Sequence, residues 1–335
     1  MMYVRNFLKK NGCDGDIQEK LKICCLNSVS DVMTCHLQET ASKLSVSAHI
    51  IEELRRNLVT QFASFPLHGT NLYEETLRLL KILPTGIDNI DELLDGGLHT
   101  GEIVEVFGPA ASGKTQLCLS IAGHVTTHLK LNVLYIDSTS SFSSERLLQI
   151  IQPKDDQSSP LSLKAALSRV RCLKSFNLFD VLKQLSKTEE ALQSEKDAFL
   201  SHVKLIVIDS ISAVISPWLG GQQQQGHALM MQLGTCLKRI ATYFGIAVLV
   251  VNNAVADYGH SSMNKLKPAL GMSWRNVPHV RLFVNFNETH HMNVSFERLV
   301  TIWKHSRQNL FISTSVYIKP CGVVSLPIET EEETS

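Results

Sequence analysis

The stretch Gly108-Pro109-Ala110-Ala111-Ser112-Gly113-Lys114-Thr115 decides the fold of this chain. It fits the pattern G-x-x-x-x-G-K-[ST], which is typical of loops that bind phosphate groups. The two glycines allow tight turns, so that successive N–H groups point into one concavity and can hold phosphate oxygens. Lys114 adds an ammonium group for the outer phosphates, and Thr115 adds a hydroxyl for Mg²⁺.

The segments on either side of this loop have the patterns of a strand and a helix. Residues 102–107 (EIVEVF) are rich in β-branched side chains, as in a buried strand. Residues 116–122 (QLCLSIA) predict a helix, whose N-terminus would place a positive dipole end beneath bound phosphates. Strand, loop and helix follow one another in the order that a site for ATP and Mg²⁺ requires. This order disfavours the alternative of a chance glycine turn.

The composition indicates a globular protein without a bulk preference for nucleic acid or membrane. Of the 335 residues, 44% are hydrophobic and 19% are charged, and Lys plus Arg equal Asp plus Glu at 32 each. A DNA contact therefore has to come from a local patch. The eight cysteines form no C-x-x-C motif, and no apolar run has the length of a signal peptide or a membrane span. We expect a soluble intracellular chain without a zinc site or a disulfide framework.

Residues 1–60 predict a small all-helical N-terminal domain. Apolar residues recur at helical spacing over one helix at 32–44 and a second at 50–58. Arg55 and Arg56 would lie on the opposite, solvated face of the second helix, either as ordinary surface residues or as a DNA contact.

Residues 61–83 have weak periodicity and are interpreted as a linker or docking segment. Phe62 and Phe65 are its candidate anchors, which either dock onto another subunit or pack against their own domain. The core of the chain is then expected over residues 84–328, followed by an acidic tail over 329–335.

A second nucleotide motif follows the phosphate loop by about 95 residues. Residues 203–210 (VKLIVIDS) form an apolar run that leads into Asp209. An aspartate at the carboxyl end of such a strand can hold Mg²⁺ through a water molecule. Buried strands that end in Asp are common, but the pairing with the loop at 108–115 makes this assignment specific.

Apolar strands that alternate with helices predict an α/β fold with a mainly parallel sheet. The other expected strands are 132–137, 246–253, 281–284 and 299–303. Ligands of such sheets bind at the carboxyl ends of the strands. Four polar residues fall at or just past those ends and are expected to converge on one site: Thr115, Asp137, Asp209 and Asn253.

These features together resemble the RecA-like recombinases. The resemblance rests on the helical N-terminal domain, the two nucleotide motifs and the runs 84–86, 96–98, 135–137 and 251–253. Residues 219–223, 228–233 and 267–271 are similar in particular to the D-type paralogues of the eukaryotic recombinase. The resemblance covers nearly the whole chain and implies a RecA-like P-loop ATPase core. It further implies a nuclear protein of homologous recombination repair that binds ATP, Mg²⁺ and single-stranded or branched DNA and assembles with sister paralogues.

The chain departs from this family at the residues that would hydrolyse ATP. Active members carry a water-polarising glutamate where this chain has Thr139, and a threonine hydroxyl is no general base near neutral pH. Glu145 falls six residues later, within the next expected helix. The family's γ-phosphate sensor, a glutamine, corresponds to the shorter Asn253. By resemblance Lys114 and Asn253 are the candidate catalytic residues, and the two departures predict that ATP is held more than hydrolysed.

Two segments correspond to the family's DNA-binding loops and are weakly basic here. The first, residues 216–226, has four consecutive glutamines and neither Lys nor Arg, so it would release few counterions. The second, residues 255–267, is suited to stacking on single strands through its aromatic and basic residues Tyr258, His260, Lys265 and Lys267. Both segments are also compatible with ordinary flexible surface loops.

Three functions fit these patterns. The first is an ATP-gated assembly subunit with slow turnover, and the second is an autonomous DNA-dependent ATPase that forms filaments and exchanges strands. The third is a metabolic kinase, which is disfavoured because nothing between Asp137 and Asp209 suggests an acceptor pocket. Thr139 and the glutamine-rich segment favour the first function over the second.

Overall fold

The computed structural model describes residues 2–13, 17–24, 26, 29–62, 66, 68–152, 160–194, 197–219, 223–256, 266–286 and 296–325. Contacts divide the chain into two compact units, Met1–Tyr73 and Glu74–Ser335. The border falls inside a helix, α6 (Gly69–Leu79), in the segment interpreted as a linker. The apolar residues of α6 at Leu72 and Leu77 are exposed, so no buried stripe produces a clear helical period there.

The first unit is a bundle of short helices: α1 (Met2–Lys10), α2 (Ile17–Ile23), α3 (Val29–Thr34), α4 (Leu37–Leu44) and α5 (Ala48–Phe62). Aliphatic side chains from every helix form its core. The one helix expected over 32–44 is in fact two, α3 and α4. Helix α3 ends at Thr34, and α4 begins at Leu37 after a break at residues 35 and 36.

The sequence pattern predicted that Arg55 lies on a solvated face, and this prediction is wrong. Its side chain is partly buried, and Nε donates to the carbonyl oxygen of Val32 at 2.9 Å. The guanidinium also donates to the carbonyl oxygen of Cys35, so it binds carbonyl groups at the C-terminal end of α3. Arg56 is exposed.

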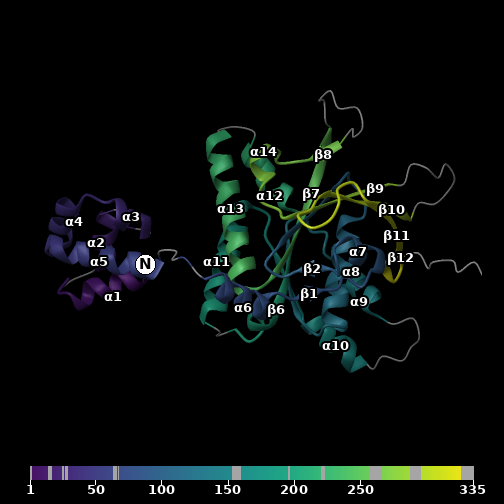
Figure 1. The fold of residues 1–335 in the computed structure, drawn as a ribbon, viewed down its shortest axis with the longest axis horizontal. Helices are drawn as coiled ribbons and strands as arrows, with labels where there is room; N and C mark the ends of the chain where they lie inside the picture. The colour runs from purple at the N-terminus through teal and green to yellow at the C-terminus, as the bar shows by residue number, and fades with distance from the viewer. Residues whose placement is uncertain are drawn as a thin grey trace, which may run out of the picture. The chain divides into compact units, whose positions relative to one another are not determined.

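A ten-stranded sheet runs through the second unit, in the order β12-β11-β10-β9-β3-β7-β6-β4-β5 with β8 paired to β7 (Figure 1). The strands are β3 (Ile103–Gly108), β4 (Asn132–Asp137), β5 (Val170–Lys174), β6 (Val203–Asp209), β7 (Ala247–Ala256), β8 (Leu266–Pro268), β9 (Val280–Phe286), β10 (Glu297–Lys304), β11 (Ser313–Lys319) and β12 (Gly322–Ser325). From β9 to β5 the neighbours are parallel, and β10 to β12 continue the sheet antiparallel. The mainly parallel RecA-like α/β core predicted from the sequence is confirmed. A separate small sheet pairs β1 (Ile82–Leu83) with β2 (Leu98–His99).

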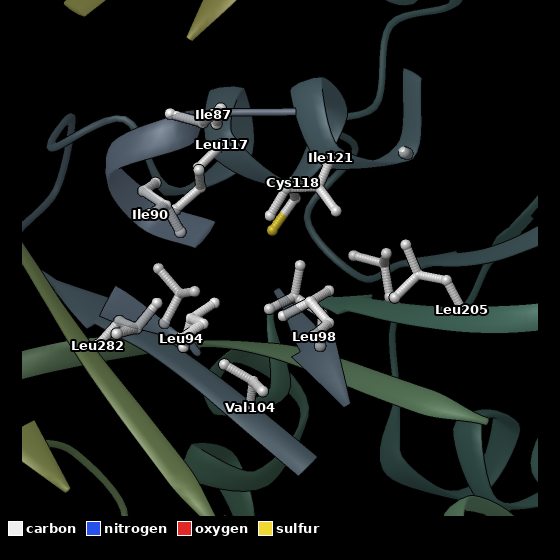
Figure 2. Packing of buried hydrophobic residues seen from close by; sticks show 14 of the residues in the cluster. Ile87, Ile90, Leu94, Leu98, Val104, Leu117, Cys118, Ile121, Leu205 and Leu282 are labelled. Atoms are coloured by element: carbon white, nitrogen blue, oxygen red, sulfur yellow. The ribbon is translucent and has the colours of Figure 1, made fainter. Parts of the chain in front are cut away.

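Helices cover both faces of this sheet, which is why its central strands are apolar on both sides. The helices are α7 (Asp88–Leu93), α8 (Lys114–Thr127), α9 (Ser144–Ile151), α10 (Pro160–Ser168), α11 (Leu178–Ser194), α12 (Ile211–Leu219), α13 (Gln223–Phe244) and α14 (Gly271–Trp274), with a 3₁₀ turn at Leu200–His202. Figure 2 shows one layer, in which Ile90 of α7 and Leu117 of α8 lie above Leu282 and Val104 of the sheet. In the described part of the chain, no helix is both long and apolar enough to cross a bilayer.

Candidate nucleotide-binding site

The phosphate loop joins the end of β3 to the start of α8 in a backbone path that requires glycine twice. A Cβ on Gly108 would lie 2.1 Å from the carbonyl oxygen of Val284. Gly113 has φ = +97°, and a Cβ there would lie 2.5 Å from the Cδ1 atom of Ile318. The neighbouring strands β9 and β11 therefore lie so close to the loop that neither position has room for a side chain.

Lys114 is the first residue of α8 and is only 8% exposed. It is therefore a buried helix residue and not a residue of an exposed loop. Its Nζ donates to the carbonyl oxygens of Gly108 at 3.0 Å and Pro109 at 2.7 Å. Burial lowers the pKa of Lys114, and the carboxylate of Asp209 opposes that effect. The ammonium group thus lies within the loop and could exchange these carbonyl oxygens for phosphate oxygens.

Thr115 and Asp209 meet beside the loop, as the two motifs predicted. The Thr115 hydroxyl donates to Asp209 Oδ2 at 2.6 Å, and the Tyr135 hydroxyl donates to the same oxygen at 3.0 Å. Burial raises the pKa of the Asp209 carboxyl, while these two hydrogen bonds lower it. A hydroxyl and a carboxylate held this close fit a Mg²⁺ ion bound by Thr115 and, through water, by Asp209.

Sequence reasoning missed the role of Tyr135. The sequence pattern predicts only its place in a strand, yet it is fully buried on β4, and its hydroxyl donates to Asp209. The available signal was its position, two residues before Asp137 and therefore on the same face of the strand.

Asp137 lies next to this site, but its carboxylate points to the chain that follows β4. Oδ1 accepts the backbone N–H groups of Thr139 at 3.1 Å and Ser141 at 3.2 Å, and Oδ2 accepts that of Phe142 at 3.2 Å. Asp137 therefore shapes the turn between β4 and α9. Its position at the strand end places it near the site without making it an ion ligand.

Thr139 is exposed in this turn, and its hydroxyl donates to Ser141 Oγ at 2.8 Å. Glu145 lies in the first turn of α9, as expected, and is exposed. Among the described residues of this turn, 138–143, no carboxylate takes the place of the family's glutamate.

The sequence pattern predicted that Asn253 ends a strand, but the residue lies within β7. β7 continues to Ala256 because residues 254–256 pair with β8. Asn253 is the register partner of Gly108, so the exposed side chain sits beside the first residue of the phosphate loop. Its backbone N–H donates to Asn252 Oδ1 at 2.8 Å, and its carbonyl accepts the N–H of Ala269 at 2.8 Å.

A buried polar network behind the loop was not predicted. Glu105 of β3 is fully buried and pairs with Arg281 of β9, with Oε2 and Nε 2.5 Å apart. Glu105 Oε1 also accepts from Asn252 Nδ2 at 2.9 Å and from Trp274 Nε1 at 2.7 Å. The network therefore connects the strand of the phosphate loop to the backbone that positions Asn253.

A hollow of about 400 Å³ lies over the phosphate loop. Phe296, Arg298 and Ile318 line it together with loop residues, and Arg298 Nε donates to the carbonyl oxygen of Ser112 at 3.1 Å. A larger hollow of about 570 Å³ lies around the C-terminal half of α8, and none of its lining residues belongs to the phosphate loop. The position of the motif residues, and not the size of the hollow, marks the smaller hollow as the candidate nucleotide site.

The described ends of the two segments matched to DNA-binding loops are helix and strand. Residues 216–219 belong to α12 and 223–226 to α13, so the described glutamines, 223–225, form the first turn of a helix. Val255 of β7 pairs with Lys267 of β8, so the two described ends of the second segment lie in paired antiparallel strands, and Lys267 is exposed. Tyr258, His260 and Lys265 lie outside the described residues.

Fold and site together define a protein with a RecA-like core and a P-loop motif. A family model described as Rad51 matches residues 77–289, more than half of the chain, and the chain belongs to the Rad51 family. The "DNA repair protein RAD51 homolog 4" of Mus musculus is 38% identical over 318 residues, which cover 94% of this chain and 95% of that protein. The Bos taurus protein of the same name is 39% identical over 278 residues, or 83% and 84% of the two chains. The family predicted from the sequence is confirmed.

A solved structure supports the fold alone. The RadB recombinase superposes with a TM-score of 0.57 over 73% of this chain and 100% of its own, at 24% identity. At this identity the similarity supports the RecA-like fold of the core and assigns no role to individual residues.

Proposed function

We propose that this protein is an ATP-binding subunit of homologous recombination repair that works in the nucleus. The relatives from Mus musculus and Bos taurus are DNA repair proteins by name, and their likeness extends over most of this chain. In this proposal the protein binds single-stranded or branched DNA and assembles with sister RecA-like paralogues, and the assembly supports the main recombinase.

The contact between Thr115 and Asp209 beside Lys114 is the observation that carries the nucleotide part of this proposal. Backbone N–H groups of residues 108–113 and the Lys114 ammonium would hold the phosphates of ATP. Thr115 and, through water, Asp209 would hold Mg²⁺, which supplies neutralisation of the phosphate charge when bound.

Thr139 supports slow turnover. A positioned general base contributes about 10²- to 10⁴-fold to a rate, and the described turn that carries Thr139 holds hydroxyls and backbone amides in its place. Asn253 lies beside Gly108 but is one methylene shorter than the glutamine of active relatives. The nucleotide would therefore order the complex for longer than a fast ATPase allows.

Two exposed surfaces support assembly with sister paralogues. β5 ends the sheet and pairs with β4 alone among the described strands, and such an edge can accept a strand from another chain. Helix α6 exposes Leu72, Tyr73 and Leu77 in the proposed docking segment. Of the two proposed anchors, Phe62 ends α5, and its side chain lies outside the described residues, as does Phe65.

The second candidate is an autonomous DNA-dependent ATPase that forms filaments, which the complete set of Lys114, Thr115 and Asp209 also supports. The two differ in the rate of hydrolysis. We would measure ATP binding and turnover for the chain alone, with single-stranded DNA and with sister paralogues. Tight binding with little turnover in all three is expected of the assembly subunit. A rate for the chain alone equal to that of an active recombinase would refute it.

A further inference from the structure

Three large aromatic side chains are exposed around the start of α11 and the end of α12. Phe176 follows β5 and is 58% exposed, Phe179 in the first turn of α11 is 51% exposed, and Trp218 near the end of α12 is 37% exposed. We refer to these three residues as the aromatic platform. Large aromatic side chains gathered on a surface typically mark a binding site.

Two members of the platform are already in contact with each other. The rings of Phe179 and Trp218 are 5.1 Å apart between centroids, and their planes cross at 89°. An edge-to-face pair covers only one ring face, and both rings keep exposed surface on which a third flat group could stack. A heterocyclic base is a group of this kind.

The helices that carry the pair are firmly anchored. Leu178 and Val181 flank Phe179 and are fully buried, as is Ile215 before Trp218. A Cβ on Gly226 would lie 2.1 Å from the Trp218 carbonyl oxygen, so the first turn of α13 packs directly on the backbone of this tryptophan. The rings are therefore held in place before any ligand arrives, which lowers the entropy lost on binding.

Positive charge lies next to the platform. Lys183 is exposed and follows Phe179 by four residues on α11, so both side chains lie on one face of the helix. Lys174, at the end of β5, is also exposed. The nearby Asp180 accepts a hydrogen bond from Asn177 Nδ2 at 2.5 Å, so part of its acceptor capacity is taken. Open ring faces beside lysines match a chain of bases and phosphates better than an apolar peptide.

We propose that the aromatic platform stacks on bases of single-stranded nucleic acid, with Lys183 against a phosphate. This inference deepens the proposed function and rests on it. It explains how the segment 216–226 can contribute to DNA binding without a Lys or Arg of its own. Trp218 supplies the flat surface, and the charge comes from α11.

Intrinsic fluorescence offers a direct test, because Trp274 is fully buried and Trp303 is partly buried, whereas Trp218 is exposed. Titration with oligo-dT should quench the tryptophan emission of the wild-type protein in parallel with the anisotropy of a labelled strand. Trp218→Phe should abolish the quenching and keep most of the affinity, since phenylalanine still stacks.

The salt dependence of DNA binding distinguishes the contribution of base stacking from that of charge. Phe179→Leu and Trp218→Leu should each weaken binding by about tenfold with an unchanged salt slope. Lys183→Gln should instead lower the slope by about 0.7, the value for one contact on a single strand. The matched control is Tyr243→Leu, which removes a 71% exposed ring from a different helix, α13. It should change neither the affinity for DNA nor the salt slope. Thermal melting of each variant verifies that it is folded.

Unchanged affinity in both leucine variants, or tight DNA binding without quenching, would overturn the platform. Loss of co-purification with a sister paralogue while DNA binding persists would make this surface a protein interface, which also overturns it. If the wild-type chain, alone and with its paralogues, shows no salt-dependent binding at all, the DNA part of the proposed function fails first. That outcome is visible before any variant is compared.

Discussion

Lys114 connects the sequence motif to a measurable property at the scale of a single residue. Its Nζ lies on the carbonyl oxygens of Gly108 and Pro109, inside the loop that would cradle phosphates. We expect Lys114→Ala to abolish ATP binding, because the remaining N–H groups offer dipoles but no full charge. Equilibrium binding of a labelled nucleotide measures the loss.

Lys130→Ala is the control for Lys114→Ala, since Lys130 follows the same helix and is exposed. This variant should bind ATP normally. Because Lys114 is buried, its variant should be melted as well, and a folded Lys114→Ala protein with wild-type affinity would contradict the site.

Thr139 is the sharpest departure that the sequence predicts between this chain and active members of the family. Thr139→Glu should raise ATP turnover with little effect on ATP affinity, because the residue is exposed and a longer side chain can be accommodated. The gain should stay below the full 10²- to 10⁴-fold of a general base, since Asn253 remains short. Steady-state hydrolysis with and without DNA gives the answer.

Thr139→Gln separates base catalysis from side-chain size, because glutamine has the length of glutamate without a carboxylate. It should stay as slow as the wild type. If the glutamate variant is equally slow but the wild type speeds up on adding a sister paralogue, a missing neighbour, and not a missing base, limits the rate.

The hairpin of β7 and β8 is the element that would bring charge to DNA. Its arm carries Lys267 opposite Val255, two residues before Ala269, whose N–H binds the Asn253 carbonyl. Lys267→Ala should flatten the salt dependence of single-strand binding by about 0.7 in slope. Affinities at several salt concentrations test this, with Lys164→Ala on α10 as an exposed control. An unchanged slope would move the phosphate contacts to other elements.

Three strands and α14 meet at the buried network around Glu105. Glu105→Gln should lower the free energy of unfolding by about 3 kcal/mol, because Arg281 stays buried without a counter-charge. Glu102→Gln, which loses a more exposed pair with Arg307, should cost about 1 kcal/mol or less. Denaturant unfolding measures the free energy of unfolding that each variant loses. Equal losses in the two variants would contradict a special role for the network.

Stability of the whole molecule should depend on pH through His279. Its Nδ1 accepts the N–H of Ile103 at 2.8 Å, and burial lowers its pKa, which Glu102 opposes. A lowered pKa means that the unfolded chain binds the proton more readily. The stabilisation is therefore complete above the unfolded pKa of about 6.5 and is lost as the pH falls from there to the native pKa.

We expect the melting temperature to fall as the pH drops below about 6.5, with up to about 1.4 kcal/mol per pH unit from one proton. His279→Gln should flatten this dependence, because glutamine can accept the same hydrogen bond without titrating. Burial also lowers the pKa of His124 and His305, so part of the dependence should remain. His202→Gln, at an exposed site, should behave as wild type.

The sequence by itself determined the family, the strand, loop and helix around residues 108–115 and the meeting of Thr115 with Asp209, while the departure at Thr139 stays a prediction. These features depend on residue identity at short spacing, where backbone sterics and local periodicity act directly. The RecA-like core followed from the same signals.

Only the tertiary structure decided which side chains meet across strands. The hydrogen bond from Tyr135 to Asp209 and the contact of Phe179 with Trp218 join residues that are distant in sequence. The carboxylate of Asp137 accepts hydrogen bonds from the turn that follows it, a direction that no local sequence pattern indicates. Glu105 looks like one polar residue in a strand until Arg281 and Trp274 are placed around it. Parallel strands bring such residues together through long crossovers, so the contacts depend on register, and register is a property of the assembled sheet.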